Sequence, residues 1–388
     1  MSQRLGLLIL VLSLAVVAPS NATPPAPQRD RGHALGTSPG PQAVYVSTSG
    51  IAHGDIANVK RLRAGRGWDP GDPNSINADW RSALDTVWDQ IAGEDADGVL
   101  ATGDMVQGYW GIDLDHTGIF GPVDTFAHKK AAVVNAGKAY EGHLRREWSA
   151  HGLTVYPGMG DHEIGDLNNA GHTSAQAFKS KALGSWLHVW EGTMGRPSYY
   201  HVRIPGSVEL WTLQPFHKTD QGVDAEIGPT QMRWLRRSLG RSTATWKVVQ
   251  TEIPPYGGEN SDHSSRTTLH NADALYGVLA RAGVDLVLSA EFHEVNAVQK
   301  RGIPEIIHGG RMQSGTVNYL VLGVYADRLD ITLKRMARAT MDGSQRLWAP
   351  GGQRPPLHIQ MSSGSTAAGH MTVTHQGVTE ATGDLVLQ

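Results

Sequence analysis

Short apolar runs, separated by stretches rich in glycine and polar residues, recur along the chain from Ala43 to about Leu333. Each run is rich in valine, leucine and isoleucine and ends in turn-forming residues, as buried strands do. The ranges predicted as strands are 43–47, 99–102, 153–156, 198–204, 208–213, 246–250, 285–289, 319–325 and 329–333.

Between these runs, apolar residues recur at a spacing of three or four positions, which is typical of amphipathic helices. The clearest case has Trp80, Leu84, Val87, Trp88 and Ile91 on one face. The ranges predicted as helices are 80–91, 128–150, 228–239 and 272–281. Because strands alternate with helices, the pattern favours an α/β fold with a mainly parallel sheet.

Acidic residues follow four of the predicted strands directly. Residues 99–102 run into Gly103-Asp104, and residues 153–156 lead through Pro157-Gly158-Met159 into Gly160-Asp161-His162-Glu163. Glu252 follows residues 246–250, and Ala290-Glu291-Phe292-His293 follows residues 285–289. A single Gly-Asp is usually a turn. In open α/β sheets, however, ligands bind at the carboxyl ends of strands, so the set predicts a metal or acid–base site.

The two ends of the chain differ from this central region. Arg4 is followed by an apolar run from Leu5 to Val17 and then by small residues, which is typical of a secretory signal peptide over residues 1–22. Residues 23–42 are rich in proline and glycine and predict a flexible leader. The predicted domain spans residues 43–341, and residues 342–388, with runs at 370–374 and 385–387, predict a C-terminal β tail.

The composition of the chain limits where the protein is expected to be found and which partners it is expected to bind. The apolar run near the N-terminus is too short to span a bilayer, and no later run is long enough, so no membrane anchor is expected in the mature chain. The sequence has no cysteine, which excludes disulfides and a lipid-bearing cysteine. We therefore expect a secreted, extracellular protein. A net charge of −3 gives no basic footprint for nucleic acid.

The order of these motifs resembles the calcineurin-like metallophosphoesterase family over residues 43–333. That family binds two metals through five blocks: Asp-x-His, Gly-Asp, Gly-Asn-His-Glu/Asp, a lone His and Gly-His-x-His. Here Gly103-Asp104 matches the second block, and Gly160-Asp161-His162-Glu163 matches the third with Asp in place of Asn. The resemblance implies a four-layer α/β/β/α sandwich, here with a short C-terminal β extension.

Three blocks depart from the family pattern. Glu252 stands where the family has its lone histidine, and Ala290-Glu291-Phe292-His293 stands where it has Gly-His-x-His. The end of the first strand, at Thr48-Ser49-Gly50, carries neither Asp nor His. His53 and Asp55 lie a few residues further on and could supply ligands only if their loop folds back.

These substitutions change the metal chemistry that the resemblance implies. One metal position would be surrounded by the oxygen ligands Asp104, Asp161, Glu252 and Glu291, a set that suits Mg²⁺, Ca²⁺ or Mn²⁺ better than Zn²⁺ or Fe. The other position would keep Asp104 and His293 but lack its first-block pair. We therefore expect one metal ion rather than two. Without a cation, the carboxylates would repel one another, unless Glu252 and Glu291 point to solvent.

The resemblance also implies the reaction, which is hydrolysis of a phosphoric ester. His162 would protonate the leaving oxygen or stabilise charge on the phosphoryl group, and Glu163 would orient His162. Tyr109, Trp110 and His308 could line the substrate pocket, although packing is the favoured interpretation of the two aromatic residues. The expected partner is a phosphoester small molecule or a phosphorylated substrate.

Two other functions stay open at this point. The lost first block favours a catalytically inactive protein of the same fold that binds a ligand or partner at the former active site. A Ca²⁺-dependent structural module outside the cell is the third reading. Retention of Asp104, His162 and His293 together favours the enzyme.

Overall fold

The computed structural model describes residues 40–51, 78–106, 120–164, 173–220, 222–258, 267–310, 312, 315–342 and 358–388. By internal contacts the chain divides into Met1–Gly40 and Pro41–Gln388. Only the second unit is considered below, because nearly all of the first lies outside the described residues. The predicted signal peptide and most of the predicted leader therefore stay predictions.

One sheet, called the first sheet here, has the strand order β16-β15-β13-β12-β1-β2-β3, with β14 paired to β13. Its strands are β1 (Ala43–Thr48), β2 (Gly98–Ala101), β3 (Val155–Pro157), β12 (Thr316–Val324), β13 (Leu329–Asp342), β14 (His358–Met361), β15 (Thr366–Thr374) and β16 (Gly377–Gly383). β1, β2 and β3 run parallel, so their carboxyl ends meet at one edge. β12 to β16 pair antiparallel and extend the other side of the sheet.

The second sheet has the order β10-β11-β9-β8-β5-β4. Its strands are β4 (Tyr200–Ile204), β5 (Val208–Thr212), β8 (Trp246–Gln250), β9 (Leu286–Ser289), β10 (Asn296–Lys300) and β11 (Ile303–Ile307). β5, β8, β9 and β11 run parallel, and β4 and β10 pair antiparallel at the two edges. A separate small hairpin joins β6 (Phe216–Lys218) to β7 (Val223–Ala225).

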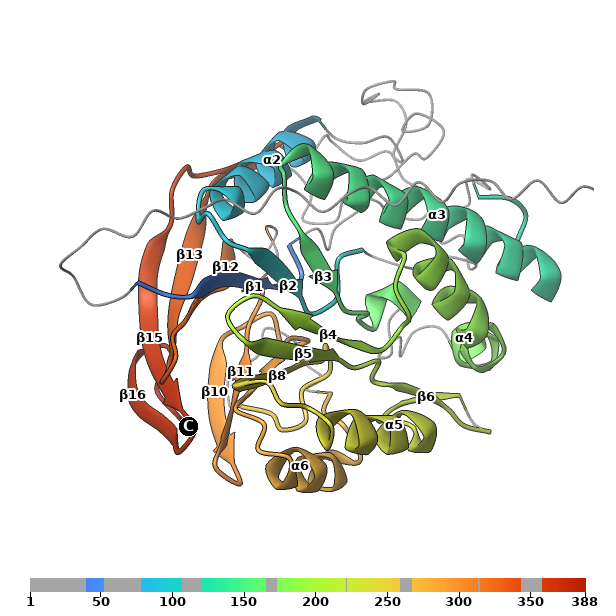
Figure 1. Cartoon of the computed structure of the whole chain (residues 1–388). Coiled ribbons are helices and arrows are strands. Elements are labelled where there is room, and N and C mark those ends of the chain that lie inside the picture. Colours follow the sequence, from blue (N-terminus) through green and yellow to red (C-terminus); the bar gives the residue numbers. More distant parts are fainter. Residues whose placement is uncertain are drawn as a thin grey trace, which may run out of the picture. The chain divides into compact units, whose positions relative to one another are not determined.

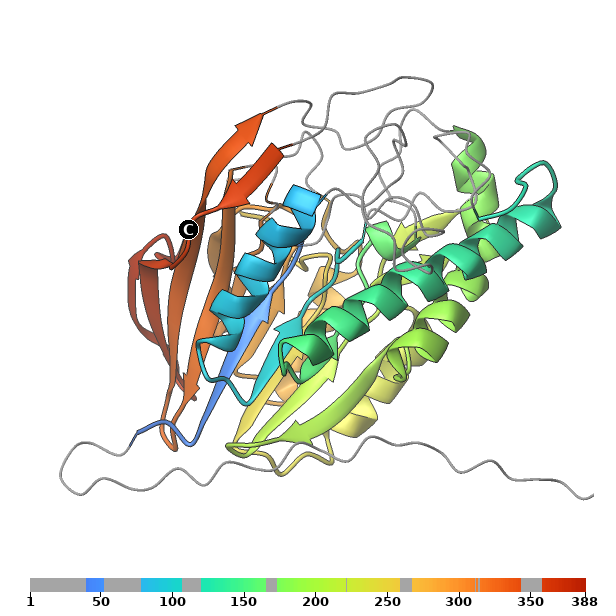
Figure 2. The same ribbon diagram turned by 90° about the horizontal axis from the view of Figure 1, so that it is seen from above.

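Helices cover the outer faces of the two sheets. α2 (Ala78–Ala92) and α3 (Phe126–Ala150) lie on the first sheet, and α5 (Pro229–Leu239) and α6 (Ala272–Arg281) lie on the second (Figure 1). α4 (Thr173–Met194) packs along α3, and the view from above shows α2 lying alongside β1 (Figure 2). The predicted α/β/β/α layering is thus confirmed.

The alternation of side chains along the strands explains this layering. Tyr45, Leu100, Leu210 and Leu288 belong to a hydrophobic cluster that fills the space between the two sheets. Their neighbours along the strands, such as Val46, belong to a second cluster that includes the buried faces of the helices. Because both faces of the central strands are buried, their sequences read as continuous apolar runs.

Two elements differ from the sequence-based expectation. Helix α4 was not predicted, because Gly184 and Gly192 interrupt its exposed side while apolar residues occur around the rest, which blurs the helical period. The strand predicted at residues 385–387 is wrong: Gly383 adopts a φ of 59° and ends β16, and the chain then turns. Leu385 is fully buried without strand pairing, so its apolar character reflects packing.

Within the described residues, no helix is both long enough and apolar enough to cross a membrane.

Candidate metal centre

The carboxyl ends of strands from both sheets meet at one place. β2 leads into Asp104 and β3 into Asp161, whereas β8 leads into Glu252 and β9 into Glu291. The segments approach closely: a Cβ atom added at Gly103 would lie 2.6 Å from the Gly160 nitrogen and 2.8 Å from the Glu252 Cβ. Gly103 also has a φ of 138°. A side chain at position 103 would therefore push the two sheets' loops apart.

The structure brings together the four carboxylates that the sequence nominated as metal ligands. One oxygen from each of Asp104, Asp161, Glu252 and Glu291 lies within 4.8 Å of the others. All four residues are buried, and Glu291 is the most exposed at 5%. The geometry thus excludes the alternative in which Glu252 and Glu291 point into solvent. An all-oxygen set of this kind fits a hard divalent cation.

Glu252 is a fully buried acid surrounded by other acids. It has no exposed surface, no backbone amide or basic side chain of the described residues donates a hydrogen bond to its oxygens, and the side chain within hydrogen-bond reach is the acid Glu291. Burial, followed by the charges of Asp104 and Glu291, raises the pKa of Glu252 well above its usual range. Buried charges of one sign need either protons or a cation to offset their repulsion.

Asp104 occupies the centre of the cluster. Its Oδ1 accepts a hydrogen bond from the His162 backbone nitrogen at 3.2 Å, and its Oδ2 lies 3.4 Å from His293 Nε2. Burial alone would raise the pKa of Asp104, but the charge of His162 and the hydrogen bond with His293 lower it to about 2. Asp104 therefore stays ionised more readily than Glu252.

Glu163 holds the Gly-Asp segment in place. Its Oε2 accepts hydrogen bonds from the backbone nitrogens of Gly160 at 2.6 Å and Asp104 at 3.0 Å, and its Oε1 accepts one from Met105 at 2.7 Å. Burial and the charge of Asp104 raise the pKa of Glu163 to about 8, against the opposing effect of these amides. This carboxyl group thus fixes the backbone that carries Asp104; its predicted role toward His162 stays a prediction.

His162 begins a single turn of 3-10 helix, η1 (His162–Ile164), directly after Asp161. It is 6% exposed, and its Nε2 lies 3.9 Å from Asp161 Oδ1. A ring nitrogen of His162 also lies within 4.8 Å of carboxylate oxygens of Asp104 and Asp161. The imidazole therefore borders the carboxylate cluster, where it could serve as a proton donor or as a ligand.

The end of β1 supplies no ionisable side chain to this cluster. Thr48 is fully buried, and its hydroxyl oxygen has no hydrogen-bond partner among the described residues. Gly50 has a φ of 70°, and a Cβ atom there would lie 3.4 Å from His293 Cδ2. The chain thus places the bare backbone of Gly50 beside His293, at a strand end that carries neither Asp nor His.

Four residues that the sequence suggested for the site, namely His53, Asp55, Tyr109 and Trp110, lie outside the described residues. Their proposed roles stay predictions.

His308, also suggested for the substrate pocket, is fully buried. Its Nε2 lies 2.8 Å from Ser47 Oγ, a contact that joins β1 to the segment after β11. Burial lowers the pKa of His308 to about 4, so the ring is neutral. With no exposed surface, His308 is placed as an inter-sheet contact.

One buried acid near the centre was missed by the sequence reasoning. Glu141 on α3 is 1% exposed, and the donor beside it among the described residues is the hydroxyl group of Thr193. Burial, followed by the charge of Glu163, raises the pKa of Glu141 well above its usual range. The signal was present in the sequence, because Glu141 falls at helical spacing with Gly137, Leu144 and Trp148 on the buried face of α3.

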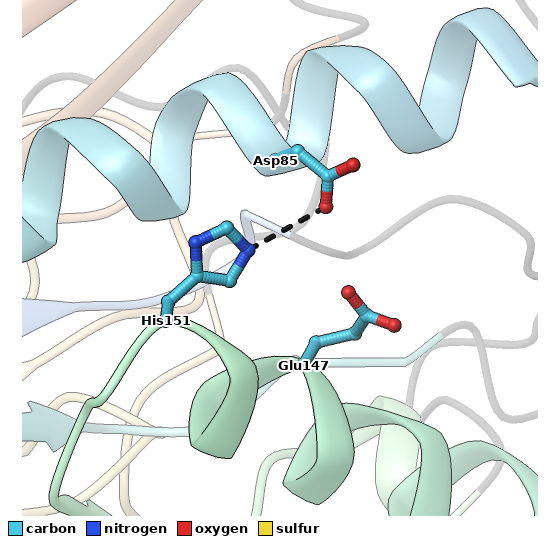
Figure 3. A group of neighbouring side chains, drawn as sticks. All are labelled: Asp85, Glu147 and His151. Atoms are coloured by element: carbon cyan, nitrogen blue, oxygen red, sulfur yellow. Dashed lines mark ion pairs between the residues drawn. The ribbon is translucent and has the colours of Figure 1, made fainter.

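A second group of acidic and histidine side chains lies apart from this centre (Figure 3). Asp85 comes from α2, and Glu147 and His151 come from the end of α3. The two nitrogens of His151 lie 3.5 Å from Asp85 and 2.9 Å from Asp89, and Glu147 lies 3.7 Å from Arg81. These side chains already form ion pairs with one another, so the group is a helix-to-helix contact and carries no metal assignment.

The chain matches the family model for calcineurin-like phosphoesterases over residues 69–295, which is more than half of its 388 residues. The matched span contains all four carboxylates, His162, Glu163 and His293. The chain therefore belongs to the calcineurin-like phosphoesterase family. Membership supports a phosphoric ester hydrolase and the use of divalent metal.

Solved structures of similar fold include a dimetal phosphatase from Danio rerio, with 11% identity, a TM-score of 0.48, and coverage of 86% of this chain and 99% of that chain. Another is PhoD, with 14% identity, a TM-score of 0.49, and coverage of 90% and 74%. A third is the calcineurin-like phosphoesterase YfkN from Bacillus subtilis, with 11% identity, a TM-score of 0.37, and coverage of 88% and 93%. No protein of curated function matches the sequence significantly.

Proposed function

We propose that this protein hydrolyses phosphoric esters at the cluster formed by Asp104, Asp161, Glu252 and Glu291, with one hard divalent cation, Mg²⁺, Ca²⁺ or Mn²⁺, as cofactor. The observation that carries the proposal is the convergence of four buried carboxylates, with oxygens within 4.8 Å, around a Glu252 to which no backbone amide or basic side chain of the described residues donates a hydrogen bond. A bound cation would polarise the phosphoryl oxygen and lower the pKa of a water molecule at the site.

The remaining groups have separate tasks in this proposal. His162 borders the cluster and would donate a proton to the leaving oxygen of a phosphoester small molecule or phosphorylated substrate. Glu163 is a positioning residue, because its oxygens hold the backbone of Gly160, Asp104 and Met105. Tyr109 and Trp110 follow the Asp104 segment in sequence and would border the substrate.

A single ion is favoured by the surroundings of His293. Its Nε2 lies 3.4 Å from Asp104 Oδ2, so the imidazole already has a charged partner. The neighbouring end of β1, Thr48-Ser49-Gly50, carries neither Asp nor His, and the part of it that approaches the His293 ring is the bare backbone of Gly50. A second cation near His293 would thus have few ligands, which supports one ion per chain.

The lack of Asp and His at the end of β1 also favours a second candidate function, that of a catalytically inactive binding protein. A protein that lost the ligands of one metal position could keep its pocket as a binding site for a ligand or partner without catalysing hydrolysis. The two candidates differ in one measurable property, because only the enzyme releases phosphate or alcohol from a phosphoester.

The test measures metal content and hydrolysis on the same protein. Chelated protein is reloaded separately with Mg²⁺, Ca²⁺, Mn²⁺, Fe²⁺ or Zn²⁺, and bound metal is counted alongside hydrolysis of an aryl phosphomonoester and an aryl phosphodiester. We expect one ion per chain, turnover with one of the first three metals, and loss of both in Glu291→Gln. Metal binding without turnover of either ester would select the binding protein. No bound metal at all would refute the proposal.

Export is the remaining part of the proposed function. The basic residue, apolar run and small residues within positions 1–22 support cleavage near Ala22 and secretion. N-terminal sequencing of protein recovered from culture medium tests this, since an intracellular, uncleaved chain would contradict it.

A further inference from the structure

A cavity of small-molecule size lies away from the carboxylate cluster. A cavity of about 450 Å³ lies between α5 and the β4–β5 hairpin, and we call it the α5 cavity. Its volume is within the range of small-molecule sites. The residues that line it are His201, Glu209, Trp234, Arg237, Ser238 and Arg241.

The charge of the α5 cavity is set by two arginines. Arg237 and Arg241 are exposed, and within the described residues neither guanidinium takes part in an ion pair or hydrogen bond. The carboxylate in the lining, Glu209, is already engaged. Its Oε1 lies 2.7 Å from His201 Nδ1, and its Oε2 accepts a hydrogen bond from Ser242 Oγ at 2.6 Å. The cavity therefore presents two positive charges that lack a negative partner.

Aromatic rings form another part of the lining. The His201 ring stacks on Trp211 with an angle of 12° between the ring planes, and its centroid lies 5.8 Å from that of Trp234. Tyr199 in turn packs edge-on against Trp234, at 4.9 Å between centroids. These contacts fix the orientation of the Trp234 ring, which is partly exposed. A fixed ring beside positive charges suits a flat group that bears an anion.

The topology separates this cavity from the metal centre. α5 starts near the carboxyl end of β5, where Gln231 accepts a hydrogen bond from the Gln214 nitrogen. It ends near the other end of that strand, where Ser242 contacts Glu209. The cavity thus lies on the outer, helix-covered face of the second sheet, whereas Glu252 follows the carboxyl end of β8.

We propose that the α5 cavity binds a phosphate monoester or phosphonate dianion that is attached to a planar ring. Arg237 and Arg241 would bind the dianion, because planar guanidinium groups donate paired hydrogen bonds to phosphoryl oxygens. Trp234 would contact the ring face. This proposal does not rest on hydrolysis at the carboxylate cluster, since no residue is shared between the two sites.

The test is calorimetric titration of the full mature protein with phenylphosphonate, whose C–P bond resists hydrolysis. Methylphosphonate, which lacks the ring, and benzyl alcohol, which lacks the charge, are the comparison ligands. The key variant is Arg237→Ala with Arg241→Ala. Its matched control is Arg233→Ala with Arg236→Ala, which removes the same charge from α5 at positions outside the α5 cavity.

We expect phenylphosphonate to bind more tightly than either comparison ligand, and the Arg237/Arg241 variant to lose about tenfold or more in affinity. The Arg233/Arg236 variant should stay within about twofold, because only long-range, screened charge is removed. Trp234→Leu should abolish the preference for phenylphosphonate over methylphosphonate. In chelated protein, where no metal can hold the phosphonate at the carboxylate cluster, Asp104→Asn should bind phenylphosphonate as the unmodified protein does.

Three results would overturn the proposal. The first is no binding of phenylphosphonate to the unmodified protein. The second is an equal loss in both arginine variants, which would indicate diffuse electrostatic attraction. The third is loss of binding in chelated Asp104→Asn, which would place the phosphonate at the carboxylate cluster instead.

Discussion

Replacement of Glu252 by glutamine should have opposite effects on stability with and without metal. Glu252 is fully buried beside Asp104 and Glu291, and no backbone amide or basic side chain of the described residues donates a hydrogen bond to its oxygens. In chelated protein, Glu252→Gln replaces a carboxyl group whose ionisation is opposed by burial and neighbouring acids with a neutral amide that can donate to a neighbouring carboxylate. We therefore expect the chelated variant to unfold at the same temperature as the unmodified protein or higher, although most substitutions of buried residues destabilise by about 0.5–3 kcal/mol.

The effect of metal follows from linkage. A cation at a concentration 100 times its Kd stabilises the folded state by about 2.7 kcal/mol. At roughly 2–4 °C per kcal/mol, Tm should rise by about 5–10 °C. If loss of one carboxylate ligand weakens binding about a hundredfold, the same concentration equals the new Kd. The stabilisation then falls to about 0.4 kcal/mol, or a rise of roughly 1–2 °C.

Thermal unfolding with and without the activating metal measures both effects. Glu305→Gln is the matched control, because Glu305 is equally buried but accepts hydrogen bonds from Tyr276, Ser289 and Tyr256 and lies outside the cluster. It should keep the full metal-dependent rise. The reasoning is refuted if Glu252→Gln keeps that rise too, or if the chelated variant is strongly destabilised.

Three further outcomes follow from other parts of the structure. Burial raises the pKa of Glu305 to about 8. The contribution of Glu305 to stability is therefore complete below its unfolded pKa of about 4.5 and is lost as the pH rises to about 8. The Tm of chelated protein should fall between these two pH values, and it should fall less in Glu305→Gln. In Gly160→Ala the new Cβ would collide with Asp104, so urea titration should show that the free energy of unfolding falls by more than about 2 kcal/mol. In Gly192→Ala, on α4, the new Cβ would lie in open space, and the free energy of unfolding should rise by up to about 1 kcal/mol. Equal effects of the two substitutions would contradict the packing argument. In His162→Asn, kcat should fall about a hundredfold while the metal-dependent rise in Tm remains, and loss of both would make His162 a ligand.

The convergence of the four carboxylates could be predicted from sequence in part, because it depends on topology. Parallel strands have their carboxyl ends at one edge, so acids placed directly after strands had to come close within each sheet. Asp104 and Asp161 follow neighbouring strands of the first sheet, and Glu252 and Glu291 follow neighbouring strands of the second. That the two pairs meet depends on how the sheets pack, which only the family resemblance indicated.

Other features could not be predicted, because they depend on long-range packing. Glu163 is a charged residue one position after His162, and nothing local indicates that it accepts hydrogen bonds from the backbone of a loop 58 or 59 residues earlier. His308 shows the same limit, since its partner Ser47 lies 261 residues away on the other sheet. Glu141 differs from both, because its helical spacing with Gly137, Leu144 and Trp148 was sufficient to place it on a buried face, and the sequence reasoning overlooked it.

Backbone conformation gives an independent reason to assign function to these strand ends. Among the described non-glycine residues, six have positive φ, and three of them, Asp104, Glu291 and His293, lie at the metal centre. Glycine would adopt these conformations without steric cost, whereas a glutamate or histidine costs roughly 1 kcal/mol there. A chain that needed only a tight turn would be more stable with glycine at positions 291 and 293. The strain at both positions is therefore best explained by what their side chains do, which is to direct a carboxylate and an imidazole toward Asp104.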